Sequence, residues 1–433
     1  MGRADTHLHT HFSGFSQLGS LMKFPESVLT PETQVDRMRS LGYDVMALTD
    51  HDETAGAFKG AKYAKRFDDI ELIVGEEVTT ADGEIIGLFL SEKVPPGLPV
   101  EETVDIIRSQ GGLVIAPHPF SFHVPGIQEK MLELDVDGFE TINGGHPDSY
   151  SNPFARKVMD AYPGRWADLA GSDAHSVYTS GTCWTEFEGT TAEDFRKSVL
   201  GRRTHAVGKA APPFGQVQWS VEVVLGGQRL LLDKLKGRLE LQEGDQLAAK
   251  IDTINRLKAG TGLVAGSAYL FPPITCLAAT LSLIYLGIGA RRMRSKEDDR
   301  LKGIGQIIRG VDSKKVGNGK KGVLQDRDVH TSVASRGADG RGRVLRVPPV
   351  PRIRQVLLLL ACHRHLEAAG RLQALPGNAW RDRGRPGDAR RVRRVRRGPG
   401  EGRRGGPQGP PLRGARHRRD PYDRLEEPRC FGR

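Results

Sequence analysis

The sequence predicts an α/β fold for about the first 210 residues of this 433-residue chain. Short apolar runs alternate there with amphipathic stretches, which is the pattern of buried strands followed by helices. Such alternation predicts a parallel sheet, either open or closed into a barrel. Charge supports the same boundary: residues 1–210 hold 19 Lys and Arg against 32 Asp and Glu, whereas residues 301–433 hold 33 against 12. The folded part is therefore acidic, and the net charge of +11 does not indicate a nucleic-acid-binding fold.

The expected elements follow one another in a regular order. Six apolar runs predict buried strands at residues 44–48, 71–74, 84–90, 112–116, 138–142 and 167–170. The amphipathic stretches between and after them predict helices at 31–40, 55–66, 100–110, 153–161 and 192–200. In the first of these helices, Thr30 is placed as the N-cap, and Pro31 occupies the first position, where its missing N–H costs nothing.

Beyond this 1–210 domain, composition divides the chain further. Residues 211–258 predict an amphipathic connector. Residues 259–290 contain no charged side chain and are followed at once by three arginines, so a transmembrane or membrane-associated segment is expected. Pro272-Pro273 leaves both a kinked span and a shallow hairpin open, and a buried core helix is the soluble alternative.

Residues 291–433 predict a basic, low-complexity tail. From residue 381 onward Arg, Gly and Pro dominate and little can be buried, so the tail is expected to be disordered. Its composition equally resembles an out-of-frame translation of GC-rich DNA, and we assign it no function.

Four scattered cysteines argue against a disulfide framework and favour a reducing compartment. No signal peptide is predicted before Asp5. We therefore expect a cytoplasmic catalytic domain, with anchoring to the inner face of the membrane through residues 259–290 as a hypothesis.

Histidine and acidic side chains follow the predicted strands. His7 and His9 end a short apolar opening, and because alternate residues share one face of a strand, both imidazoles can reach one metal ion. Four more clusters each come directly after a strand, at residues 49–52, 75–77, 117–119 and 171–175. The C-terminal ends of barrel strands meet on one rim, so this pattern predicts a metal site there.

These clusters resemble the motifs of a known family. Residues 5–13 read D-x-H-x-H-T-x-x-S, and TDHD (49–52), PHP (117–119) and SDAH (172–175) follow in order. Together they resemble the PHP superfamily, named after polymerase and histidinol phosphatase domains, and the likeness covers most of residues 3–205. The resemblance implies a distorted seven-stranded TIM-like (β/α) barrel holding two or three divalent ions, commonly manganese, zinc or iron.

The resemblance also implies the metal ligands. The expected set is His7, His9, His51, Glu77, Glu84, His118, Asp173 and His175. A first ion would lie between the N-terminal histidine pair and Asp173. Glu77 would bridge it to a second ion at His118, and the remaining two histidines would serve a third. Imidazole and carboxylate ligands suit such divalent ions.

The chain departs from the family pattern at two positions. Members often have Asp or His five positions after the second histidine of the first motif, where this chain has Gly14. This change puts full occupancy of the third site in doubt; compensation by His11 is one interpretation, and an exposed loop histidine is the other. Glu84 stands where many members have histidine, and as a carboxylate it can still bind a metal.

Further residues are candidates for substrate contacts. Asn143 follows a predicted strand and could bind a metal-held water or the substrate, and Arg156 could meet a phosphate, although a solvated helix face is the alternative. His123 and His146 are interpreted as loop residues, with a place at the substrate entrance as the alternative for either.

The predicted function is metal-dependent hydrolysis of a phosphoester bond by an activated water, with Asp173 and His175 as catalytic candidates for proton transfer. The expected substrate is a small phosphomonoester or a nucleotide-type molecule, and an oligonucleotide end stays open. One rival is an amidohydrolase that cleaves C–N bonds, which predicts a metal-bridging lysine. The other is a non-catalytic, metal-stabilised scaffold.

Overall fold

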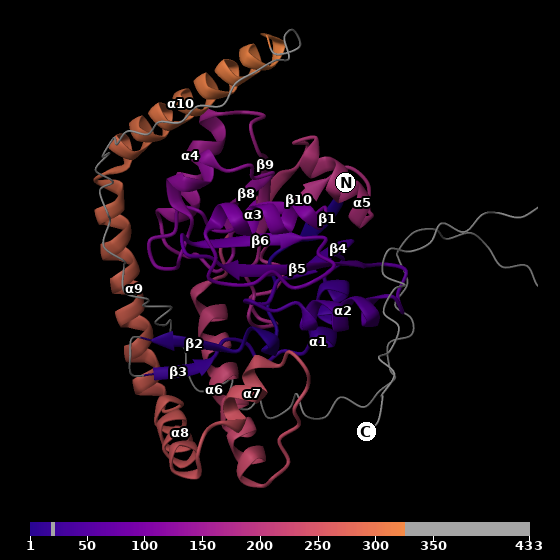
Figure 1. Ribbon diagram of the computed structural model, residues 1–433. Coiled ribbons are helices and arrows are strands. Elements are labelled where there is room, and N and C mark those ends of the chain that lie inside the picture. The colour runs from indigo at the N-terminus through magenta and orange to yellow at the C-terminus, as the bar shows by residue number, and fades with distance from the viewer. Residues whose placement is uncertain (19–21, 325–433) are drawn as a thin grey trace, which may run out of the picture. The chain divides into compact units, whose positions relative to one another are not determined.

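The computed structural model describes residues 1–18 and 22–324 (Figure 1). Nine strands of this part form one mixed sheet: β1 (Gly2–Asp5), β4 (Val45–Leu48), β5 (Glu71–Thr79), β6 (Glu84–Leu88), β7 (Leu113–Ala116), β8 (Gly138–Asn143), β9 (Ala167–Gly171), β10 (Cys183–Phe187) and β11 (His205–Gly208). Their order is β11-β10-β1-β4-β5-β6-β7-β8-β9. The pairs β1–β4, β4–β5, β7–β8 and β8–β9 are parallel, and the other four are antiparallel.

The sheet curls into a nearly closed barrel. Its edge strand β9 meets β10, because the Thr185 hydroxyl accepts from the Ala170 amide at 2.8 Å and donates to the Ala170 carbonyl at 3.0 Å. The predicted α/β barrel is thus confirmed, with nine strands in place of seven. The strands β10 and β11 were not predicted, and β6 runs antiparallel because a tight turn at Gly83, with φ of 150°, joins it directly to β5.

Helices cover the barrel where the sequence places them. They are α1 (Pro31–Ser40), α2 (Ala55–Ala64), α3 (Val100–Ser109), α4 (Ser151–Ala161) and α5 (Ala192–Leu200). The helices α1 and α5 match the predicted bounds, and the other three differ by at most two residues at either end. Thr30 caps α1 by accepting from the Thr33 amide, with Pro31 in the first turn, as predicted.

Short elements lie in the connections. A 3-10 helix η1 (His11–Ser13) precedes the hairpin of β2 (Phe15–Leu18) and β3 (Met22–Pro25), and a second 3-10 helix η2 (Gln128–Glu133) follows β7.

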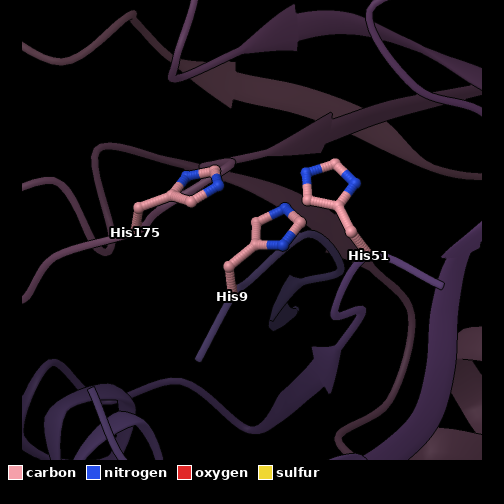
Figure 2. Close-up of side chains that lie close together, drawn as sticks. All are labelled: His9, His51 and His175. Carbon is pink, nitrogen blue, oxygen red and sulfur yellow. The ribbon is translucent and has the colours of Figure 1, made fainter. Parts of the chain in front are cut away.

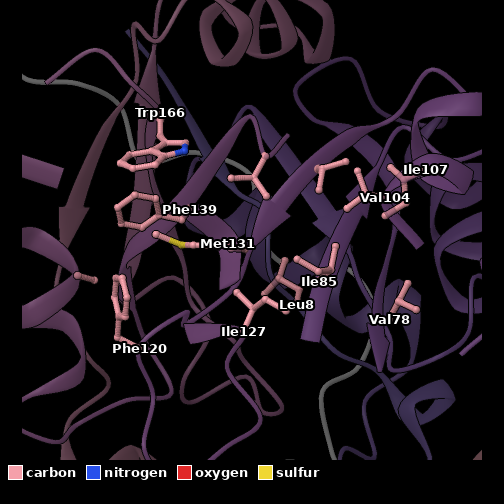
Figure 3. Close-up of a cluster of buried hydrophobic side chains, with 14 of the residues drawn as sticks. Leu8, Val78, Ile85, Val104, Ile107, Phe120, Ile127, Met131, Phe139 and Trp166 are labelled. Carbon is pink, nitrogen blue, oxygen red and sulfur yellow. The ribbon is translucent and has the colours of Figure 1, made fainter. Parts of the chain in front are cut away.

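Two hydrophobic clusters stabilise the barrel. The larger one packs residues such as Leu8, Ile85 and Phe139 against the covering helices, and Figure 3 shows part of it. In β4, Met46 belongs to this cluster while its neighbour Val45 belongs to the second, so alternate residues face opposite sides of the sheet. The second cluster joins residues from strands all round the sheet, as expected for the barrel interior.

Five helices follow the barrel: α6 (Pro213–Leu235), α7 (Gln246–Asp252), α8 (Arg256–Tyr269), α9 (Pro272–Arg294) and α10 (Glu297–Leu324) (Figure 1). The predicted apolar segment 259–290 is therefore divided between α8 and α9. The two prolines occupy the first turn of α9, where their fixed φ is tolerated, and so they start a helix instead of kinking one. Within the described residues, α9 alone is long and apolar enough to cross a membrane.

The ordered chain continues beyond residue 291, where the tail was expected to begin. Ile304 and Ile308 of α10 are buried in the larger cluster. Arg300 donates to Glu129 at 2.6 Å and to Gln128 at 2.9 Å, both in η2. The helix α10, in which apolar and charged residues alternate, therefore packs on the barrel. The rest of the predicted tail, from residue 325, lies outside the described residues.

Candidate metal centre

The predicted metal ligands come from the ends of six strands of the barrel. They lie after β1 (His7, His9), after β4 (His51), in β5 (Glu77), in β6 (Glu84), after β7 (His118) and after β9 (Asp173, His175). All of them are buried. The structure brings them together in four overlapping groups of three, and in each group the ligand atoms lie within 4.8 Å of one another.

The first group contains His7, His9 and Asp173. The Asp173 Oδ1 atom lies 3.6 Å from His7 Nε2 and 3.3 Å from His9 Nε2. Glu77 Oε2 faces the same two nitrogens, at 3.3 and 3.4 Å. Four ligand atoms from three strand ends therefore surround one small volume.

Glu77 lies between this group and the next. Its other oxygen, Oε1, is 3.0 Å from His118 Nε2, and Glu84 Oε2 lies 3.8 Å from the same nitrogen. One carboxylate thus presents each oxygen to a different group of histidines, which is the arrangement a bridging ligand needs.

A third group gathers His9, His51 and His175. Figure 2 shows the His9 ring between the other two. Ring centroids are 4.1 Å apart for His9 and His175 and 4.6 Å apart for His9 and His51. Three imidazoles in such contact place ring nitrogens from three parts of the barrel close to one another in a buried site.

The donor atoms fit divalent metal ions. The Nε2 atoms of His7, His9 and His175 and the Oε2 atom of Glu77 are buried and make no hydrogen bond within the described residues. A buried polar atom without a partner costs about 1–3 kcal/mol, so their convergence calls for a bound group. Imidazole nitrogen and carboxylate oxygen are the ligands of zinc, manganese and iron sites.

Outer hydrogen bonds orient the imidazoles. Glu140 of β8 lies 2.9 Å from His7 Nδ1 through Oε1, and its Oε2 accepts from the His118 amide at 2.8 Å. The Ser13 hydroxyl contacts His9 Nδ1 at 3.0 Å and donates to Asp50 at 2.7 Å. In both His7 and His9 the second ring nitrogen is therefore directed into the cluster, as in known metal sites.

Charge within the cluster keeps the carboxylates ionised. Burial opposes the charged form of His7, but the surrounding carboxylates raise its pKa well above the ordinary value. Burial, together with His175, lowers the pKa of His9 well below the ordinary value. Although burial alone would raise them, the neighbouring histidines hold the pKa values of Glu77 and Asp173 well below their usual range. Both carboxylates are thus available as ligands at neutral pH.

The backbone is strained at three points around the cluster. Asp52, His118 and Asp173 have positive φ values of 52°, 29° and 49°. Each follows a strand end that carries metal-ligand candidates, and non-glycine residues adopt this region at a cost. Such strain concentrates where side chains must converge on a site.

Two residues expected to contact substrate have other partners. Asn143 is fully buried; its amide donates to Glu140 at 2.7 Å, and its oxygen accepts from the Gly145 amide at 2.8 Å. Arg156 donates to Asp168 at 2.8 Å and to Thr141, whose side chain points away from that of Glu140 on β8. The structure therefore places Asn143 behind the metal ligands and Arg156 in an ion pair outside the cluster, because strand alternation directs Thr141 and Asp168 outward.

His146 and His123 lie in loops, and their rings also stack beside the metal-ligand candidates. His146 is buried, and its ring stacks on that of His118 at a centroid distance of 5.0 Å and on that of His123 at 4.5 Å. His123 contacts Asp148 at 3.2 Å. The stack extends the histidine cluster on the side of His118.

Sequence reasoning missed the contribution of Glu140 and of the helices after the barrel. The Trp219 ring of α6 lies 5.8 Å from that of His175, and Gln246 of α7 donates to the His51 carbonyl at 2.7 Å. The amphipathic connector thus closes one side of the cluster. Glu140 could have been found from the sequence, because an acidic residue in the interior of a predicted buried strand is unusual. The contacts of the helices, in contrast, depend on tertiary packing alone.

Comparisons with known proteins agree with the fold and the cluster. A family model described as PHP-associated matches residues 152–204, a segment from α4 to α5 that contains Asp173 and His175. The protein MJ1587 of Methanocaldococcus jannaschii is 41% identical over 162 residues, which are 37% of this chain and 94% of that protein.

Solved structures with lower similarity include two bacterial proteins. PsfC from Pseudomonas syringae PB-5123 is 16% identical, with a TM-score of 0.39, and the match covers 51% of this chain and 98% of that one. A proposed metal-dependent phosphoesterase from Bifidobacterium adolescentis is also 16% identical, with a TM-score of 0.33 and coverage of 46% and 96%. The PHP-associated family model, which spans two of the residues in the histidine–carboxylate cluster, carries the assignment: this chain belongs to the PHP superfamily.

Proposed function

We propose that this protein hydrolyses a phosphoester bond of a small phosphorylated molecule. At the coarser level, PHP membership and the histidine–carboxylate cluster make it a metal-dependent hydrolase. The observation that carries the proposal is the Glu77 carboxylate, which faces two histidine groups with its two oxygens. Two divalent cations held by these groups would supply positive charge for the attacking and leaving oxygens of a phosphoryl transfer.

When bound, the divalent ions would lower the pKa of a coordinated water and neutralise charge on the phosphoryl oxygens. The protein's own residues position these groups and move protons. Asp173 lies among the ligands, and its ionised carboxylate can accept a proton from the attacking water. His175 is the second candidate for proton transfer; because its Nδ1 lies 2.9 Å from the Asp173 carbonyl, it could take this role only through Nε2 and only while that nitrogen holds no ion.

The surroundings of the cluster support a small substrate. Trp219 and Gln246 close one side of it, and His146 stacks on the other. A phosphomonoester or a nucleotide-type molecule is small enough to reach a site enclosed on two sides. A polymer, in contrast, needs an open groove along which it can bind.

The amidohydrolase alternative predicts a lysine inside the site. Among the lysines whose side chains the structure describes, none is buried, and none belongs to the four groups of metal-ligand candidates. This observation favours phosphoester hydrolysis over C–N bond cleavage on the same barrel.

The test measures hydrolysis of a generic phosphate monoester by the full chain, first stripped of metal and then reloaded with Mn²⁺. We expect metal-dependent turnover, and we expect Asp173→Asn to lower kcat/KM by at least about 100-fold. Asp135→Asn is the matched control, because the Asp135 side chain is 88% exposed. Metal binding without turnover on any phosphate ester would favour the scaffold alternative, and turnover unchanged in Asp173→Asn would contradict the proposal.

A further inference from the structure

The structure explains why the usual ligand is missing after the first motif. Gly14 has φ of 78° and ψ of −120°, a combination that side chains rarely adopt. A Cβ atom at this position would also lie 3.0 Å from the Gln246 Cβ of α7. The backbone conformation and the packing of α7 therefore both disfavour an aspartate or histidine here.

A glutamate from the following hairpin occupies the neighbouring space. The chain leaves Gly14 through β2 and returns through β3, so that the Glu26 amide donates to the Gly14 carbonyl at 3.0 Å. The Glu26 side chain is 2% exposed. The hairpin thus brings a buried carboxylate beside the position that lacks one.

The Glu26 carboxylate points at the third histidine group. Its Oε1 atom lies 3.3 Å from His51 Nε2 and 3.6 Å from His175 Nε2. Two ligands that each lie about 2.1 Å from one ion are roughly 3.0–3.5 Å apart, so the 3.3 Å distance falls within the range for a shared metal ion and the 3.6 Å distance lies just beyond it. His175 Nε2 is buried and makes no hydrogen bond within the described residues, which leaves its lone pair for such an ion.

Neighbouring residues fix Glu26 in this position. The Ser16 hydroxyl donates to Oε1 at 2.9 Å, and the Trp219 indole of α6 donates to the Glu26 carbonyl at 2.9 Å. His11, the other residue that could replace the missing ligand, is paired instead with Asp245 at 3.0 Å. Glu26 is therefore the oriented carboxylate next to His51 and His175.

We propose that Glu26 completes a third divalent-cation site with His51 and His175, in place of the ligand absent at Gly14. The inference rests on the proposed function of the same cluster, since His51 and His175 belong to the same set of buried ligand candidates as Glu77. Its ligand set of two imidazoles and one carboxylate suits manganese, zinc or iron.

The experiment counts Mn²⁺ ions on the full chain, by elemental analysis and by calorimetric titration after chelator treatment. We expect three ions per chain in the wild type and two in Glu26→Gln, with the two tighter affinities unchanged. Glu188→Gln, whose side chain is 79% exposed, should keep all three.

A second variant keeps the carboxylate and serves if Glu26→Gln does not fold. Ser16→Ala removes the hydrogen bond to Glu26, and it should weaken the third ion alone by about 10–100-fold. Three ions bound with unchanged affinity in both variants would overturn the inference, as would a wild type that binds two ions. A wild type that binds none would instead refute the proposed metal-dependent function itself.

Discussion

Glu140 determines the orientation of two ligands on separate strands. Its two oxygens contact the His7 ring at 2.9 Å and the His118 amide at 2.8 Å, and Asn143 donates to it as well. The carboxylate is 1% exposed. A buried carboxyl group of this kind is tolerated because each oxygen has hydrogen-bond partners, and its contact with Nδ1 leaves Nε2 of His7 facing the other ligand candidates.

We predict that Glu140→Gln lowers Mn²⁺ affinity about 10–100-fold, because the neutral amide is a weaker acceptor for the His7 ring. Calorimetric titration of the full chain measures the effect, with Glu188→Gln as the exposed control. Equal affinities in the two variants would mean that Glu140 has no part in orienting His7.

At the scale of elements, local signals and long-range packing have separate roles. The helix α1 begins where Thr30 and Pro31 place it, and α5 begins with a reciprocal capping box between Thr191 and Asp194. The helix α10, in contrast, is held by packing: Ile304 is fully buried, and Arg300 reaches Glu129 in η2. Residues far from the site in sequence thus stabilise the barrel that carries it.

We predict that Ile304→Ala lowers the free energy of unfolding by about 2–4 kcal/mol, because it leaves a cavity between α10 and the barrel. Urea denaturation of the full chain measures this change. The exposed neighbour provides the control, since Lys302→Ala should stay within about 0.5 kcal/mol of the wild type. A similar stability for both variants would show that α10 does not pack on the barrel in solution.

At the scale of the whole molecule, one helix surface has no partner in the described part of the chain. Along α9, Leu277, Leu281 and Ile288 are 60%, 54% and 57% exposed, whereas Ala290 near its end is buried against the barrel. Arg291, Arg292 and Arg294 follow in its last turn. An apolar face next to a basic turn suits the surface of an anionic membrane.

We propose that α9 associates with membranes and predict that the full chain co-sediments with anionic phospholipid vesicles. The double variant Leu277→Glu/Leu281→Glu should weaken this binding at least about tenfold, because it places charge in the apolar face. Leu200→Glu on α5 is the matched control, since that leucine is 50% exposed on the barrel. Vesicle binding that is absent, or equal in all three proteins, would refute the proposal.

Much of the fold could be predicted because its signals are local. Apolar runs, caps and the residues after each strand indicated the barrel and the helices α1 to α5. The short strands β10 and β11 escaped prediction because β10 mixes polar and apolar residues on both its buried and its half-buried positions, and β11 has no buried position. Their place in the sheet follows from antiparallel pairing with β1 and each other, which no local pattern specifies.

The sequence by itself determined the fold class, and the resemblance of its motifs to the PHP superfamily supplied the eight metal-ligand candidates. Only the tertiary structure decided how these side chains meet and what surrounds them. Barrel closure places Glu140 behind His7, a hairpin carries Glu26 to the position next to Gly14, and α6 sets Trp219 against His175. These contacts join segments far apart in sequence, so they depend on the packing of the whole barrel.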